Sequence, residues 1–190
     1  MNSNREGKAR IIILGLGPGE PGMLTREAWE VLNQVQEVYL RTRQHPTVNG
    51  FPPDLEVHSF DHLYEDGDSF NQVYRTIVDR VLTLSGRETG VVYAVPGDPF
   101  IAEATTPAIL RTARDKHIPC RVVSGMSFIE PTFAALGLDP LPHTALVDAL
   151  ELSDAHHPPF PPGAPALIAQ LHSPLVASHV KLTLMAVYED

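Results

Sequence analysis

The chain has 190 residues, of which 43% are hydrophobic, and this is enough to bury a core without disulfide bonds. The single cysteine excludes an intramolecular disulfide, and a formal net charge of -9 argues against nucleic acid or an anionic membrane as the main partner, because both select basic surfaces. No apolar run approaches the ~20 residues that a membrane-spanning helix needs, and residues 1–10 are polar and unlike a secretory signal. We therefore expect a cytoplasmic protein that binds neither nucleic acid nor membrane.

Apolar runs rich in β-branched residues alternate with amphipathic segments through the first two thirds of the chain. The runs predict strands at 10–16, 37–42, 55–60, 90–95 and 119–124. The intervening segments repeat apolar residues every three or four positions, which predicts helices at 24–35, 69–84 and 102–117. Thr25 and Ser69 stand where N-caps are expected. This alternation indicates an α/β fold with a mainly parallel sheet.

The pattern changes after about residue 125. A short helix, "SFIEPTFAALG", precedes a possible strand at 143–150 and a loop rich in proline and histidine at 153–165. A strand at 166–172 and a helix from about Pro174 to Tyr188 follow. We place a domain boundary near residue 125, with an N-terminal α/β domain at 1–125 and a C-terminal one at 126–190. The second is short for an α/β domain, so we expect it to be incomplete.

The first predicted strand runs into the loop "GLGPGEPGMLT" at 15–25, which satisfies the pattern G-x-G-x-x-G at 17–22. A dinucleotide site is not favoured, because Pro18 and Pro21 remove two backbone N–H donors and no acidic residue ends the second strand. No Gly-Lys-Ser/Thr follows, which argues against a P-loop. Without side chains, Gly15 and Gly17 allow another group to approach the backbone closely, although a plain strand-to-helix turn would also explain them.

Two further irregular loops follow predicted strands, "AVPGDPFIAEAT" at 94–105 and "SGMSF" at 124–128. The carboxyl ends of parallel strands meet at one edge of a sheet, where open α/β sheets bind ligands. Asp98 lies between Gly97 and Pro99, so its carboxylate is held on a stiff turn. It is either a ligand-binding group or an ordinary turn aspartate that bonds its own backbone.

These loops carry a family resemblance. In order and spacing, "GLGPGEPGMLT", "VPGDPFIAEAT" and "SGMSFIEPTFAALGLDP" resemble the tetrapyrrole (corrin/porphyrin) methylase family, and the similarity extends over essentially the whole chain. Within that family, "YLRTRQHPTV", "HLYEDGDSFNQVYRTIVDRV" and "SHVKLTLMAVYED" most resemble the methylase-like N-terminal half of bacterial proteins fused to a MazG-type nucleotide pyrophosphohydrolase.

The resemblance implies a homodimeric methyltransferase that binds S-adenosyl-L-methionine in a cleft between two α/β domains, with a small molecule or a peptide as the methyl acceptor. The positions that match the family's cofactor contacts are Pro18, Gly97, Asp98, Ile101, Ser127, Phe128 and Leu171. An alternative reading is a non-catalytic module that binds the cofactor or dimerises in the service of a MazG-type pyrophosphohydrolase.

Three residues are candidates for the acceptor side. Arg41 ends the second strand and could hold an acceptor carboxylate as a bidentate pair, or it could be a surface arginine paired with a neighbouring acid. Tyr64 and Tyr74 resemble tyrosines that related peptide backbone N-methyltransferases place around the acceptor amide, but they could equally be half-buried packing residues. The arginine that those enzymes carry four residues before the second tyrosine is replaced by Phe70.

We expect no metal ion. Methyl transfer from a sulfonium requires neither a metal nor a covalent nucleophile, because the methyl group is already activated. His156 and His157 are adjacent in a proline-rich loop without a cysteine partner, which is a poor ligand set for zinc.

Overall fold

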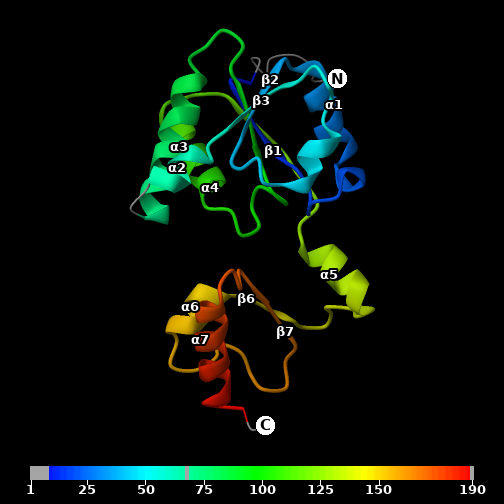
Figure 1. Cartoon of the computed structure of the whole chain (residues 1–190), viewed down its shortest axis with the longest axis vertical. Helices are drawn as coiled ribbons and strands as arrows, with labels where there is room; N and C mark the ends of the chain where they lie inside the picture. Colours follow the sequence, from blue (N-terminus) through cyan, green and yellow to red (C-terminus); the bar gives the residue numbers. More distant parts are fainter. Residues whose placement is uncertain (1–8, 67–68, 189–190) are drawn as a thin grey trace. The chain divides into compact units, whose positions relative to one another are not determined.

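The computed structural model describes residues 9–66 and 69–188. The chain divides into two compact units, Met1–Thr132 and Phe133–Asp190. The division falls inside helix α5 (Ile129–Leu136), whereas the sequence predicted a boundary near residue 125, in the loop that precedes this helix. Figure 1 shows the course of the chain through both units.

Unit 1 is built on a five-stranded sheet in which every pair of neighbours is parallel, with the order β3-β2-β4-β1-β5. The strands are β1 (Ile11–Gly15), β2 (Glu37–Leu40), β3 (Glu56–Ser59), β4 (Val91–Val95) and β5 (Cys120–Val123). Each lies inside a predicted apolar run, so the predicted parallel α/β sheet is confirmed. All of β4 is buried, as expected for the central strand of a sheet covered on both faces.

The helices of unit 1 follow the predicted periodicities. They are α1 (Arg26–Gln34), α2 (His62–Asp66), α3 (Phe70–Leu84) and α4 (Thr105–Asp115), with 3-10 turns η1 (Pro21–Met23) and η2 (Pro46–Gly50). Both predicted N-caps are confirmed, because Thr25 and Ser69 accept hydrogen bonds from the backbone N–H groups of Ala28 and Gln72. Helix α2 was not predicted, since its five residues are too few to show a period.

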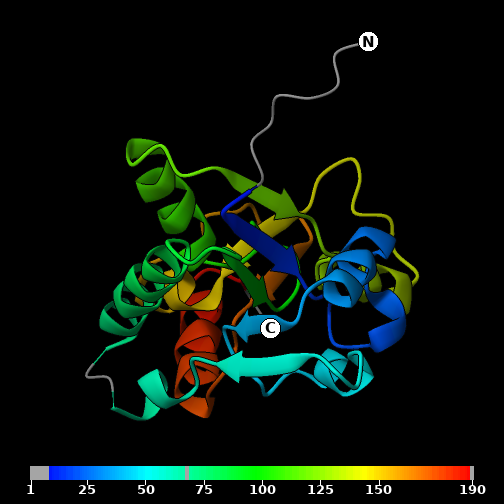
Figure 2. The same cartoon turned by 90° about the horizontal axis from the view of Figure 1, so that it is seen from above.

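Two apolar cores lie on opposite faces of this sheet. On one face, Ile11, Ile13 and Tyr93 pack with buried residues of α3 and α4. On the other face, Leu14 and Val38 pack with the buried residues of α1. Figure 2 shows the green helices on one side of the strands and the blue helix on the other. The result is a three-layer arrangement that leaves the loops at the strand ends to carry function.

Unit 2 contains a two-stranded parallel sheet, β6 (Ala145–Asp148) and β7 (Ala166–Ala169), with α6 (Ala149–Asp154) and α7 (Pro174–Met185). Both strands are shorter than predicted. Asp148 accepts a hydrogen bond from the N–H of Leu150 and so starts α6 inside the predicted strand. Gln170 has a φ of 65° and ends β7 after Ala169.

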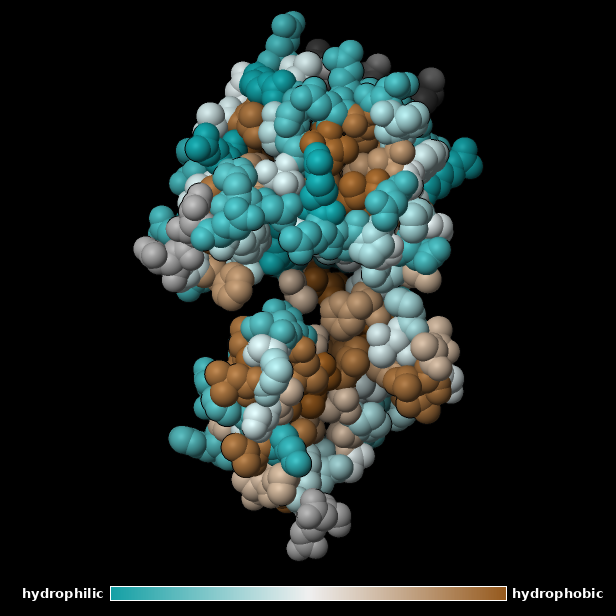
Figure 3. Space-filling view, viewed as in Figure 1, coloured by the Kyte–Doolittle hydropathy of each residue, from teal (hydrophilic) through white to brown (hydrophobic). Residues whose placement is uncertain are grey.

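The core of unit 2 is small. Ala149, Leu152 and Val180 are its buried apolar residues, and partly buried side chains from both strands and α7 surround them. Much apolar surface of this unit is left exposed, as its brown side chains in Figure 3 show. The exposed large side chains of this unit are Leu136, Leu138, Leu141, Leu146, Leu150, Leu171, Leu175, Leu182, Met185 and Val187. Within the part of the chain that the structure describes, no helix combines the length and apolar character required to cross a bilayer.

Candidate functional site

Three loops meet at the carboxyl edge of the central strands of unit 1. They follow β1, β4 and β5, and their backbones touch at Gly15, Gly97 and Gly125. A Cβ atom on Gly15 would lie 2.7 Å from the Gly97 oxygen and 2.7 Å from the Cα of Gly125. Any side chain here would therefore force the loops apart.

Hydrogen bonds hold the first two loops together. Gly17 and Gly97 form an antiparallel bridge, in which the Gly97 N–H donates to the Gly17 carbonyl at 2.8 Å and the Gly17 N–H donates to the Gly97 carbonyl at 3.2 Å. Both glycines have positive φ angles, 74° and 69°. The close backbone approach predicted for Gly15 and Gly17 is real, and the approaching groups are the neighbouring loops.

Asp98 connects the second loop to the third. Its Oδ1 accepts a hydrogen bond from the N–H of Phe100 at 2.9 Å, and its Oδ2 accepts one from the N–H of Gly125 at 3.3 Å. The first bond is that of the turn aspartate considered above, and the second is a bond between loops. The Asp98 carboxylate therefore holds the second and third loops together.

The side of this junction at Gly97 is open. A Cβ atom built on Gly97 meets no atom within 4 Å, unlike one built on Gly15. Pro18 and Ile101, from the first and second loops, are partly exposed. A ligand can thus reach the backbone of Gly97 and the side chains of both residues.

The third loop supplies Ser127 and Phe128. The Ser127 hydroxyl is buried, donates to Glu130 Oε2 at 2.6 Å and accepts from the N–H of Ile129 at 3.0 Å, so it caps the start of α5. This bond from Ser127 lowers the pKa of Glu130. Phe128 is partly exposed. Leu171 belongs to unit 2, where it follows β7 and is 50% exposed.

The segment between β2 and β3 is hydrogen-bonded to the loop that follows β1. The buried Thr47 hydroxyl donates to the Leu16 carbonyl at 3.1 Å. Beside it, the Nδ1 atom of His45 is buried with no hydrogen-bond partner in residues 9–66 and 69–188. Burial lowers the pKa of His45, and a backbone interaction with Gly17 partly offsets this effect. The imidazole is therefore neutral at pH 7.

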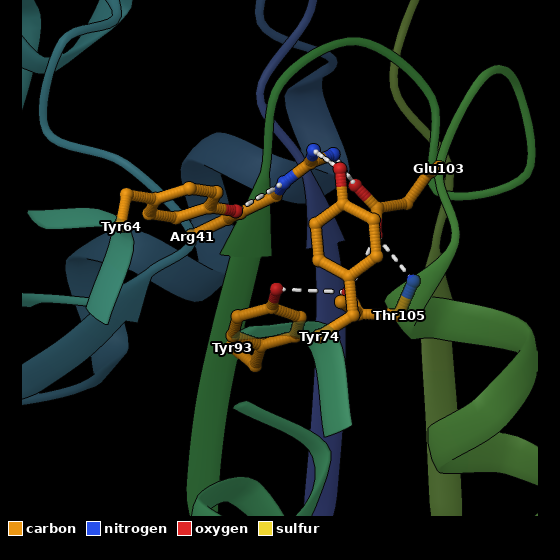
Figure 4. A network of polar contacts seen from close by, with 6 residues as sticks. All are labelled: Arg41, Tyr64, Tyr74, Tyr93, Glu103 and Thr105. Carbon is orange, nitrogen blue, oxygen red and sulfur yellow. Dashed lines mark hydrogen bonds and ion pairs between the residues drawn. The ribbon is translucent and has the colours of Figure 1, made fainter. Parts of the chain in front are cut away.

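The three predicted acceptor-side residues come together in one polar cluster at the end of β2 (Figure 4). Arg41 donates from Nε to the Tyr64 hydroxyl and from a terminal nitrogen to the Tyr74 hydroxyl, each at 3.1 Å. The guanidinium also lies over the ring of Tyr74, with Cζ 5.1 Å from the ring centroid. Tyr64, on α2, and Tyr74, on α3, are both partly exposed.

Glu103 completes this cluster, although it was not among the residues predicted from the sequence. Its Oε2 pairs with Arg41, while its Oε1 accepts hydrogen bonds from the N–H and the hydroxyl of Thr105. The Glu103 side chain is only 1% exposed, compared with 21% for Arg41. Of the two readings of Arg41, pairing with an acid of the protein is the one observed, although the pair is largely buried and not on the surface.

The charges of this cluster compensate one another. Burial alone would lower the pKa of Arg41, but the Glu103 carboxylate and the two phenols raise it above its ordinary value. Burial raises the pKa of Tyr64, and the Arg41 guanidinium opposes this effect. The guanidinium of Arg41 is therefore charged and the phenol of Tyr64 neutral at pH 7.

Deeper in the cluster, Tyr93 is fully buried on β4, and its hydroxyl lies 2.9 Å from Thr105 Oγ1. Because the Thr105 hydroxyl gives its one proton to Glu103, Tyr93 must be the donor in this bond. Burial raises the pKa of Tyr93 well above its usual value. The Glu103 carboxylate is thus held by a chain of hydrogen bonds that runs from the Tyr93 hydroxyl through the Thr105 hydroxyl.

The family model described as Tetrapyrrole (Corrin/Porphyrin) Methylases matches residues 10–158. Among curated proteins, "Uncharacterized protein YabN" of Bacillus subtilis (strain 168) is 34% identical over 187 residues. The alignment includes 95% of this chain but only 36% of that protein, so the chain spans about a third of its relative's length.

Solved structures of uroporphyrin-III C-methyltransferase from Thermus thermophilus are similar in fold. One of them aligns with a TM-score of 0.56 at 24% identity, over 73% of this chain and 60% of that enzyme. Another, complexed with S-adenosylhomocysteine, aligns with a TM-score of 0.50 at 19% identity, over 74% of this chain and 59% of that enzyme. At these identities the similarity establishes a shared fold.

Proposed function

The chain belongs to the tetrapyrrole (corrin/porphyrin) methylases, and on this premise we propose that it is a methyltransferase that uses S-adenosyl-L-methionine. The observation that carries the proposal is the junction of three loops at the carboxyl ends of β1, β4 and β5, which is open at Gly97. It has the position of a ligand site in an open parallel sheet.

The residues of this edge fit such a cofactor. Pro18, Ile101 and Phe128 offer partly exposed apolar surface, and the backbone at Gly97 offers a close approach. Asp98 and Ser127 act by holding the loops, because their side-chain oxygens already bond to backbone groups. Leu171 of the second unit is the remaining proposed contact. When bound, the cofactor supplies a methyl group activated on a sulfonium.

The acceptor is assigned to the cluster of Arg41, Tyr64 and Tyr74. These side chains come from β2, α2 and α3 of the same unit, and hydrogen bonds fix the orientation of all three. The role of the protein in a methyl transfer is to position the reactants and exclude water, so pre-ordered polar groups suit it. A small molecule or a peptide remains the proposed acceptor.

The experiment is calorimetric titration of the chain with S-adenosylhomocysteine, comparing Gly97→Ala with Gly137→Ala. Both glycines have nearly the same positive φ, 69° and 66°, and a Cβ atom meets nothing within 4 Å at either, so the backbone strain is matched. We expect micromolar binding that weakens at least about tenfold in Gly97→Ala only, because the new methyl group enters the open side of the junction. Absence of binding by the folded chain would refute the cofactor, and equal binding by both variants would refute this location.

A second function is a module that binds the cofactor without catalysis, or that dimerises, beside a MazG-type pyrophosphohydrolase. Two observations favour it: the chain matches only 36% of its longer relative, and the second unit exposes many large apolar side chains. Such exposed surface is typical of an interface, and we propose a homodimer in the cytoplasm.

Incubation with methyl-labelled cofactor and a metabolite extract distinguishes the two functions. Labelled product that disappears in Tyr74→Phe supports the enzyme, and cofactor binding without any product supports the module.

A further inference from the structure

The proposed acceptor cluster consists of Arg41, Tyr64 and Tyr74, and the positive charge of Arg41 is already neutralised by the protein. Arg41 is paired with Glu103, which is almost completely buried, so the guanidinium has a permanent counterion inside the protein. A second carboxylate at Arg41 would bring a negative charge close to Glu103, and like charges at short range in a partly buried site repel strongly. The bidentate clamp on an acceptor carboxylate, considered for Arg41 from the sequence, is therefore disfavoured by this geometry.

The directions of the hydrogen bonds leave two donors free. Tyr64 and Tyr74 both accept from Arg41, because a guanidinium can only donate. Each phenol therefore keeps its own proton, and within residues 9–66 and 69–188 neither hydroxyl donates that proton to another group. Both side chains are partly exposed, so these protons can reach a ligand.

The adjacent surface is aromatic. Phe70 is 59% exposed, and its ring packs against Tyr74 at 6.2 Å and against Tyr64 at 6.4 Å between centroids. A ligand oxygen that accepts from the phenols thus lies beside an apolar ring. This combination suits a planar neutral group, such as an amide, lactam or enolisable ketone.

We propose that Glu103 is a specificity-determining residue: by neutralising Arg41 it makes the two phenols bind a neutral carbonyl-type oxygen of the methyl acceptor and reject a carboxylate. The inference rests on the proposed function in one respect, since it takes this cluster as the acceptor site. Glu103 does not touch the acceptor in this scheme and acts through Arg41.

The same arrangement assigns the phenols a chemical role. The amide nitrogen or the enolisable carbon of the acceptor would first release a proton to water, which places negative charge on the carbonyl oxygen, where two O–H donors stabilise it. That nitrogen or carbon would then form the bond to the methyl carbon while the carbon–sulfur bond breaks and its electron pair leaves with the sulfur, so that both products are neutral at the reacting atoms. Tyr64 and Tyr74 are then hydrogen-bond donors and not general bases.

The test uses the whole chain with tyrosine labelled with carbon-13 in the ring, and the ring signals are assigned from Tyr64→Phe and Tyr74→Phe. N-methylacetamide and acetate are the probes, and neither requires the cofactor. In the wild-type chain we expect the amide to shift both signals at lower concentration than acetate. In Glu103→Gln, which keeps the size of the side chain, we expect the ratio of the two affinities to move at least about tenfold toward acetate.

Glu130→Gln is the matched control, because Glu130 also accepts a bond from a hydroxyl but belongs to α5. It should leave the probe ratio unchanged. A pH titration of the same samples is a further readout: without the Glu103 charge, which raises the pKa of Tyr64, that pKa should fall. No response of either tyrosine to the amide, or an unchanged ratio in Glu103→Gln, would overturn the proposal. A failed titration with S-adenosylhomocysteine would leave these measurements intact and would refute only the cofactor.

Discussion

Replacing Gly15 by alanine should destabilise the first unit strongly, because the junction of the three loops has no room for a methyl group. The new Cβ atom would lie 2.7 Å from the Gly97 oxygen and 2.7 Å from the Cα of Gly125. The backbone nitrogen of Gly125 would be closer still, at 2.4 Å, whereas an ordinary contact begins at 3.4 Å, so the loops must separate by roughly 1 Å. The neighbouring hydrogen bond from the Leu16 N–H to the Val95 carbonyl, 2.9 Å long, would be stretched as well.

The expected cost follows from these two effects. Overpacking a tight site costs about 1–3 kcal/mol, and a weakened buried hydrogen bond adds about 1 kcal/mol. We expect the free energy of unfolding to fall by about 3 kcal/mol. Urea unfolding followed by tryptophan fluorescence measures this change in the right unit, because Trp29 on α1 is the single tryptophan of the chain.

Gly22→Ala is the matched control from the same loop. A Cβ atom there meets no atom within 4 Å and the backbone is not left-handed, so a change below about 0.5 kcal/mol is expected. If Gly15→Ala unfolds at the same urea concentration as Gly22→Ala, the close contact of the loops is wrong. A large loss of stability in both variants would show instead that the whole loop at 15–25 is sensitive to substitution, and not only its contact with the other two loops.

Three further outcomes are expected. Thr47→Val keeps the buried shape but removes the donor to the Leu16 carbonyl, so urea unfolding should show a loss of about 1–2 kcal/mol, whereas an unchanged midpoint would contradict this bond. In the folded chain the pKa of His45 lies below its ordinary 6.5, so the unfolded chain binds more protons and the free energy of unfolding should fall as the pH drops below about 6.5. The slope of this free energy against pH should be smaller in His45→Gln. Equal slopes in the two proteins would contradict the burial of the imidazole. Leu152→Ala empties part of the small core of the second unit and should cost about 2–5 kcal/mol there, seen as lost amide exchange protection in α6 and α7 while α3 keeps its protection.

Much of the fold could be predicted from local patterns. The strands and the long helices of the first unit stand within the predicted ranges, and both N-caps are where the sequence placed them. The predictions were weaker where one residue decides the backbone. Asp148 starts a helix before the end of one predicted strand, and the left-handed Gln170 ends another early. A single cap or turn residue leaves no periodicity to read.

The candidate site was predictable in part. The glycine loops and the tyrosines were singled out, but Glu103 was missed, although it lies in the loop after β4 that contains Gly97 and Asp98. The pairing of Arg41 with Glu103 depends on β2 and β4 being neighbours in the sheet. The strand order was not visible in the sequence, and 62 residues separate the two partners.

What the sequence alone determined is local: alternating strands and helices, loops rich in glycine and proline at the strand ends, and a family resemblance that the match over residues 10–158 confirms. Tertiary structure decided what those residues touch. It fills the space beside Gly15 with the backbones of two other loops, and it gives Arg41 a buried counterion. The physical reason is that periodicity and turn chemistry act over a few residues, whereas close packing and charge pairing depend on which segments the sheet brings together.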